Sequence, residues 1–229
     1  MNIEIFTHPS KKEDVETNNK IKKIIEDRSA VIAKELKTDV KDINVNMYFD
    51  GTSVASKVGR TTDDKLGIFS GYIDYENAFH IAHPIGVQPI FGDNLWKQMG
   101  IMIDYCLYKF YLCEIYFPKG QPYKLYYKYL TDSIARLLSG YYNRQSLIFE
   151  VRNFTDIKKY KKDTELKIAF FTMLEKSESS MITDNLDELY TTCDIKKSLV
   201  TVYKKEFKEL IGLYQKELIQ ADKEIKKVR

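Results

Sequence analysis

The sequence predicts an α+β fold, with a small antiparallel or mixed sheet and an amphipathic helix in the N-terminal part, followed by a mostly helical C-terminal half. Alternation of apolar and polar residues is confined to short runs before residue 93, and helical periodicity dominates after it. Hydrophobic residues make up 44% of the 229 residues, which is ordinary for a packed globular protein. We expect residues 1–92 and residues 93–229 to form one compact domain together.

The N-terminal part begins with a strand, a helix and a second strand. The opening residues MNIEIF are strand-like. Apolar residues recur mostly three and four apart over residues 13–36, which predicts an amphipathic helix facing a core. Residues 43–49 alternate apolar with polar side chains, a pattern typical of a half-buried strand.

A loop and a hairpin are expected next. The polar segment that follows Asp50 and Gly51, up to Lys65, predicts a mobile loop. Residues 66–73 and 78–82 read as two short strands joined by a tight turn, and we expect them to pair as a hairpin. Proline and glycine then predict an irregular crossing into the helical part, at Pro84, Gly86, Pro89 and Gly92.

The C-terminal half has mainly helical periodicity. The first two helices are expected over residues 93–112 and 123–142, the second stopping at Ser139-Gly140. Residues 146–151 fit either a strand or an extended link. Further helices are expected over residues 163–178, 182–190 and 194–229.

A seven-residue repeat marks the last of these helices from Phe207 onward. One core position of the repeat holds Ile211, Leu218 and Ile225, and the other holds Phe207, Tyr214, Ala221 and Val228. Such a seam suits a coiled coil or a long helix packed on a neighbour.

Charge, cysteine content and the N-terminus narrow the function classes. The 36 basic and 33 acidic residues are interspersed, which argues against nucleic acid as a partner. The longest apolar stretches are broken by Asp104, Lys109 and Glu114, and the N-terminus has no signal-peptide core, so no membrane association is expected. The three cysteines form no CxxC or Cys/His cluster, which favours the cytoplasm.

Residues 43–142 carry a resemblance to a known family. Their order of strand, hairpin, buried helix, loop and second helix resembles the gluzincin group of zinc peptidases, in which one helix carries HExxH and a later helix supplies an acidic ligand. The most specific part is YLTDSIARLLSG (residues 129–140), similar to the family's acidic-ligand helix. On this alignment Asp132 takes the position of the acidic ligand.

The first helix departs from the family at each catalytic position. If IMIDYCLYKF (residues 101–110) matches the HExxH helix, Asp104, Tyr105 and Tyr108 replace the first histidine, the glutamate and the second histidine. Zinc peptidases use imidazole ligands and a glutamate that accepts a proton, and a phenol with a pKa near 10 does not replace that glutamate unaided. The resemblance therefore implies a zinc site that was lost or never acquired, and no cofactor is predicted.

An oxygen-rich cation site is the competing interpretation. Asp104 and Asp132 could supply carboxylate ligands for Mg²⁺, Ca²⁺ or Mn²⁺, and Asp104 shares a helix face with Tyr108. His80 and His83 lie three apart on a predicted strand and therefore point to opposite faces, so we expect ordinary hydrogen-bonded histidines there.

Three functions remain in competition. The first is a peptidase-like domain without catalysis, which binds a peptide or protein in a groove between the hairpin edge and the two central helices. The second is a divergent metal-dependent hydrolase or peptidase that uses Asp104 and Asp132. The third is a structural or assembly protein that forms a homo-oligomer through residues 207–228.

Overall fold

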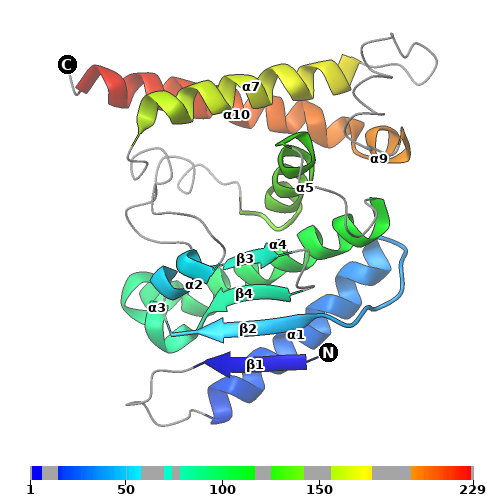
Figure 1. The fold of residues 1–229 in the computed structure, drawn as a ribbon, viewed down its shortest axis with the longest axis vertical. Helices are drawn as coiled ribbons and strands as arrows, with labels where there is room; N and C mark the ends of the chain where they lie inside the picture. Colours follow the sequence, from blue (N-terminus) through cyan, green and yellow to red (C-terminus); the bar gives the residue numbers. More distant parts are fainter. Residues whose placement is uncertain are drawn as a thin grey trace. The chain divides into compact units, whose positions relative to one another are not determined.

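The computed structural model describes residues 2–6, 15–49, 51–57, 70–73, 78–116, 125–141, 156–176 and 197–227. The chain divides into two compact units, Met1–Tyr111 and Leu112–Arg229, a division that falls within a long helix and beyond the boundary expected at residue 92. Helices hold most of the described residues, and the described strands all lie in the first unit (Figure 1). The α+β class is confirmed, in a mainly helical form.

The first unit contains a four-stranded mixed sheet. Its strand order is β1-β2-β4-β3, with β1 parallel to β2, β2 parallel to β4, and β3 antiparallel to β4. The expected hairpin pairing of β3 with β4 is confirmed, although its turn lies outside the described residues. The strands are β1 (Asn2–Phe6), β2 (Asn44–Tyr48), β3 (Ser70–Ile73) and β4 (Ala78–Ala82).

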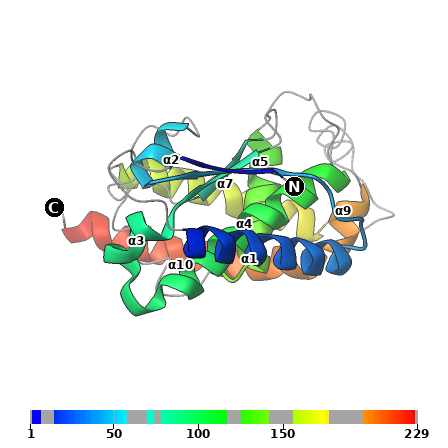
Figure 2. The ribbon, with the colours of Figure 1, turned by 90° about the horizontal axis from the view of Figure 1, so that it is seen from below.

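Helices cover both faces of this sheet. In Figure 2, α1 lies along one face of the sheet and α2 lies against the other. Val45 and Met47 alternate with half-buried residues on β2, whereas all five residues of β4 are buried. The helices of this unit are α1 (Val15–Glu35), α2 (Gly51–Lys57), α3 (Pro84–Phe91), the 3₁₀ turn η1 (Gly92–Asn94) and α4 (Leu95–Tyr116), whose last turn belongs to the second unit.

Two predictions for the first unit are wrong. Residues 51–57, expected to begin a mobile loop, form α2, which is anchored by the fully buried Val54. The crossing expected to be irregular is α3. Pro84 occupies the start of this helix, where its missing N–H leaves no hydrogen bond unmade, and the His83 side chain caps it. Gly92 then takes a φ of 50°, a backbone conformation that favours glycine.

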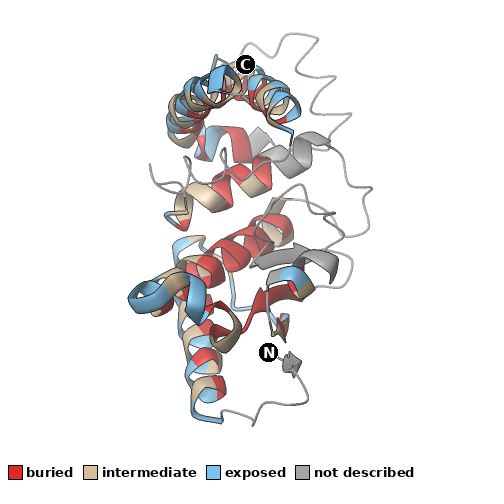
Figure 3. Ribbon diagram, turned by 90° about the vertical axis from the view of Figure 1, so that its left-hand side faces the viewer, coloured by how far each residue is buried: buried red, intermediate tan, exposed pale blue. Residues whose placement is uncertain are grey.

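The second unit consists of helices in its described part. They are α5 (Leu125–Leu138), α7 (Ile157–Lys176), α9 (Lys197–Val202) and α10 (Lys204–Lys227), together with the last turn of α4. Helices α7 and α10 lie side by side and antiparallel, with buried residues on their facing sides (Figures 1 and 3). The segments at 146–151 and 182–190 lie outside the described residues.

The ends of two helices follow from local chemistry. Helix α5 stops where it was expected, and Gly140 follows it with a φ of 71°. Helix α7 begins earlier than predicted because Asp156 caps it. The Oδ1 atom of Asp156 accepts hydrogen bonds from the backbone N–H groups of Lys158 and Lys159, at 3.1 and 3.0 Å.

The predicted seam of α10 is half correct. Phe207, Tyr214 and Ala221 are buried, which confirms one core position of the repeat, while Val228 lies outside the described residues. The other position is wrong, because Ile211, Leu218 and Ile225 are only half-buried. The second buried row of the helix contains Leu210 and Glu217 instead, and Tyr203, the residue just before α10, is buried as well.

Candidate functional site

Asp104 lies in the middle of α4 and faces α1. Its two carboxylate oxygens accept hydrogen bonds from Nε and Nη2 of Arg28, both at 2.7 Å. This two-point geometry is the strongest that an arginine makes with a carboxylate. The Asp104 side chain is 16% exposed and that of Arg28 is 38% exposed. Hydrogen bonding to Asp104 raises the pKa of Arg28, so the guanidinium stays protonated.

Tyr108 lies one turn beyond Asp104 and also faces α1. Its hydroxyl donates a hydrogen bond to Oε2 of Glu35 at 2.7 Å. Burial, followed by the hydrogen bond to the Glu35 carboxylate, raises the pKa of Tyr108 far above its usual value. Tyr108 is therefore a persistent hydrogen-bond donor, and a base at this position would need the opposite shift.

Arg28, Glu35, Asp104 and Tyr108 form what we term the α1–α4 polar cluster. The sequence analysis placed Asp104 and Tyr108 on one helix face but did not find their partners. Arg28 and Glu35 lie two turns apart on α1, beside the buried residues Ser29 and Ile32. Charged residues at the border of an apolar helix face are candidates for ion pairs with a neighbouring helix, although this pattern does not identify which helix they contact.

Tyr105 points into the core instead. Its side chain is 5% exposed, and the amino group of the buried Lys109 lies 3.5 Å from its hydroxyl and 5.8 Å from its ring centroid. The position that the peptidase alignment gives to the catalytic glutamate thus holds a core tyrosine beside a buried amine.

Asp132 belongs to α5, in the second unit. Its Oδ2 atom lies 2.9 Å from Nε of Arg136, one turn further along the same helix. The guanidinium of Arg136 also lies over the ring of Tyr141, 5.0 Å from its centroid. The neighbouring Ser133 is buried, and its hydroxyl is hydrogen-bonded to that of Tyr214 at 2.5 Å. Each of the two candidate metal ligands therefore has an arginine partner within its own unit.

His80 and His83 take part in hydrogen bonds, as expected. His83 Nδ1 accepts a hydrogen bond from the N–H of Ile85 at 3.2 Å, so Nε2 carries the proton that it donates to Asn18 Oδ1 at 2.8 Å. His80 is fully buried, with Nδ1 lying 3.1 Å from the Tyr48 hydroxyl. Within the described ranges, no three His, Cys, Asp or Glu side chains gather closely enough to hold a metal ion.

An edge of the sheet is a second candidate feature. The terminal strands of the described sheet are β1 and β3, and β3, the strand of the hairpin, is paired on one side with β4. Helix α2 contacts β2, β3 and β4. Such an edge can pair with an extended peptide through backbone hydrogen bonds.

Comparisons with family models, with curated proteins and with solved structures find no match to this chain. The resemblance to zinc peptidases stays a prediction from the order of the elements and from residues 129–140. No helix in the described part of the chain is long and apolar enough to cross a bilayer.

Proposed function

We propose that the chain is a peptidase-like, non-catalytic module that binds a peptide or protein partner. The observation that carries the proposal is the two-point ion pair of Arg28 with Asp104, since it engages both oxygens of the carboxylate that would replace a zinc ligand. A cation at that carboxylate would have to displace a guanidinium held by two 2.7 Å hydrogen bonds. The Tyr108 hydroxyl is also occupied, because it donates a hydrogen bond to Glu35.

The edge strand β3 is the binding element in this proposal. An extended segment that adds to β3 gains backbone hydrogen bonds without a metal or a catalytic base. The resemblance to gluzincins supports this assignment, because it implies a substrate groove beside the same hairpin. Cys106 and Cys113 are buried as thiols and not joined in a disulfide, which fits the expected reducing compartment of the cytoplasm.

A display library of extended peptides, screened against the full-length chain, tests the binding mode. We expect a selected peptide to slow amide hydrogen exchange at residues 70–73. Successive N–H groups of a strand point to opposite edges. Proline has no N–H, so one of the variants Gly71→Pro and Tyr72→Pro removes an N–H that points outward from β3, and the other removes an N–H that points toward β4. The variant that loses the outward N–H should keep the circular dichroism spectrum of the wild type and should lose peptide binding. Protection confined to other segments, or wild-type binding by that variant, would contradict the proposal.

Metal content separates this function from the hydrolase alternative that uses Asp104 and Asp132. We expect mass spectrometry of untagged protein, purified without chelator, to find no stoichiometric metal in the wild type or in Asp132→Ala. The matched control is Asp163→Ala, which removes an aspartate from a similar ion pair with Lys167 on α7. Near-stoichiometric metal in the wild type and the control that disappears in Asp132→Ala would establish the hydrolase alternative instead.

The structure leaves fewer residues of α10 for a homo-oligomer interface than the sequence implied. Phe207, Tyr214 and Ala221 of α10 are buried within the second unit, so they are already used by the chain itself. A homo-oligomer through residues 207–228 would have to use the half-buried row of Ile211, Leu218 and Ile225.

A further inference from the structure

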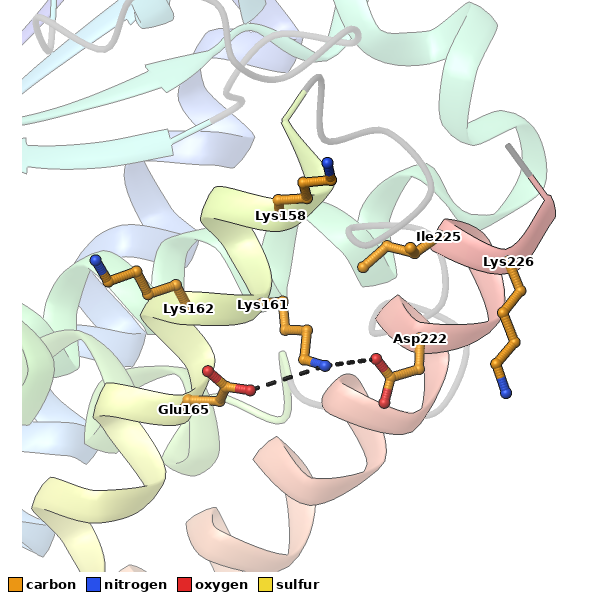
Figure 4. Close-up of a pocket in the computed structure, with 7 residues that line it drawn as sticks. All are labelled: Lys158, Lys161, Lys162, Glu165, Asp222, Ile225 and Lys226. Carbon is orange, nitrogen blue, oxygen red and sulfur yellow. Dashed lines mark hydrogen bonds and ion pairs between the residues drawn. The ribbon is translucent and has the colours of Figure 1, made fainter. Parts of the chain in front are cut away.

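A cavity of about 570 Å³ lies between the first turns of α7 and the last turns of α10. Its volume is within the range of roughly 300–1,000 Å³ that is common for small-molecule sites. Figure 4 shows its lining side chains, which come from both helices. Its charged lining residues are Lys158, Lys161, Lys162, Glu165, Asp222 and Lys226.

One lysine engages both acids of this lining. The amino group of Lys161 lies 2.7 Å from Oδ1 of Asp222 and 3.9 Å from Oε1 of Glu165. The hydrogen bond to Asp222 raises the pKa of Lys161, so the amino group stays protonated. Four lysines against two acids leave a formal charge of +2 in the lining.

The other three lysines have uncommitted amino groups. Within the described residues, the side chains of Lys158, Lys162 and Lys226 make no ion pair or hydrogen bond. Figure 4 shows that the three amino groups point in different directions, those of Lys158 and Lys162 from α7 and that of Lys226 from α10. A multivalent anion entering between them would meet cations from α7 on one side and from α10 on the other.

The lysines at the start of α7 work against the stability of that helix. Four lysines occur in its first six residues, IKKYKK, and Lys158 and Lys159 lie in the first turn, where the positive end of the helix dipole disfavours cations. Lys158 also has like charges three and four residues further on, at Lys161 and Lys162. Local rules that are broken without a structural gain are expected at functional sites.

We propose that this lysine-lined cavity binds a small multivalent phosphate anion. Ammonium groups act as point charges for phosphate oxygens, and the three uncommitted amino groups can turn inward on their flexible stems to contact it. Ile225 supplies an apolar wall for the remainder of the ligand. The cavity lies in the second unit, so this inference goes beyond peptide binding at β3 and is tested separately from it.

Isothermal titration calorimetry of the full chain with inorganic pyrophosphate at low ionic strength tests the site. The triple variant Lys158→Gln/Lys162→Gln/Lys226→Gln should lose about tenfold or more in affinity. The control variant Lys204→Gln/Lys208→Gln/Lys216→Gln removes the same charge from exposed positions of α10 and should change affinity less than about twofold. Lys158 opposes the dipole of α7 and Lys226 favours that of α10, so these two effects offset and the cavity variant should melt at about the wild-type temperature. No binding by the wild type, or equal losses in the two variants, would overturn the proposal.

A second arm distinguishes a free phosphate compound from a lipid headgroup. Vesicles of phosphatidylcholine with a phosphoinositide bisphosphate are sedimented with the chain, with and without pyrophosphate. Pyrophosphate binding without vesicle binding assigns the site to a free compound, and vesicle binding that pyrophosphate displaces assigns it to a headgroup. Binding to a single-stranded oligonucleotide that is lost in the cavity variant, with no pyrophosphate binding, would replace the proposal with a nucleic-acid surface.

Discussion

A tyrosine that donates to a carboxylate behaves differently from one in water. The Tyr108 side chain is buried and its hydroxyl is bonded to Glu35, and both effects favour its neutral form. This hydroxyl therefore binds its proton more tightly in the folded chain than in the unfolded chain. Folding is stabilised below the ordinary tyrosine pKa near 10, and this contribution is lost as the pH rises toward the higher folded pKa.

Replacement of Tyr108 by phenylalanine tests this linkage. Tyr108→Phe should lower the free energy of unfolding by about 1 kcal/mol at pH 7, since it removes one hydrogen bond. Urea denaturation at pH 7, 9 and above 10 should show the gap between wild type and variant shrinking above pH 10. The control Glu35→Gln keeps an acceptor oxygen and should lose less at pH 7. A gap that is constant over this range would contradict the raised pKa.

At the residue scale, the sequence predicted the shared helix face of Asp104 and Tyr108 but not the residues with which they interact. A spacing of four residues on a helix places two side chains on one face, and the structure places both there, toward α1. Arg28 and Glu35 lie more than seventy residues earlier in the chain. No local period links residues that far apart, so the ion pair that determines the chemistry of Asp104 could not be predicted.

At the scale of helices and strands, periodicity predicted the elements that bury one regular face. Helix α1, β2 and the hairpin of β3 with β4 follow from such patterns. Helices α2 and α3 were missed because their sequences, GTSVASK and PIGVQPIF, contain weak helix formers or prolines. Both are held by tertiary contacts and capping, through Val54 for α2 and His83 for α3.

The second core row of α10 was missed for a different reason. Glu217 is 2% exposed, although glutamate is rarely buried. The Tyr160 hydroxyl donates a hydrogen bond to its Oε2 atom at 2.9 Å, which offsets part of the cost of burial. A search for apolar repeats passes over such a position and selects the neighbouring row of Ile211 and Leu218 instead.

Two alanine substitutions distinguish these rows. Tyr214 is 1% exposed, packs on Phe171 with ring centroids 6.0 Å apart and bonds to Ser133, so Tyr214→Ala should cost about 3–5 kcal/mol. Leu218→Ala, on the half-buried row, should cost about 1 kcal/mol. Urea denaturation followed by circular dichroism measures both. Equal costs would mean that Leu218 is as important to the core as the seam of Phe207, Tyr214 and Ala221.

At the scale of the whole molecule, the two units can be followed separately. Trp96 is the single tryptophan of the chain, and it lies in the first unit with the Lys20 amino group 3.6 Å from its ring centroid. Its fluorescence therefore reports on the first unit, whereas far-ultraviolet circular dichroism reports on the helices of both. The mixed sheet and the order of its strands lie in the first unit, while the α7–α10 pair belongs to the second.

A mutation in one unit should therefore separate the two signals. In Tyr214→Ala, part of the circular dichroism transition should move to lower urea while the midpoint of Trp96 fluorescence stays within error of the wild type. The reciprocal variant Ile25→Ala, at a fully buried position of α1, should shift the fluorescence midpoint. Coincident shifts of both probes in both variants would show that the units unfold as one cooperative body.

The Arg28–Asp104 pair also predicts how the chain can change over generations. Loss of Arg28 alone would leave a largely buried carboxylate without its cation, and loss of Asp104 alone would leave a guanidinium against α4. Substitutions at positions 28 and 104 should therefore occur together in descendants of this sequence, as an exchanged pair of charges or as two neutral residues. The same coupled inheritance should link Glu217 with Tyr160, because a glutamate is acceptable in that core only while the tyrosine hydroxyl meets it.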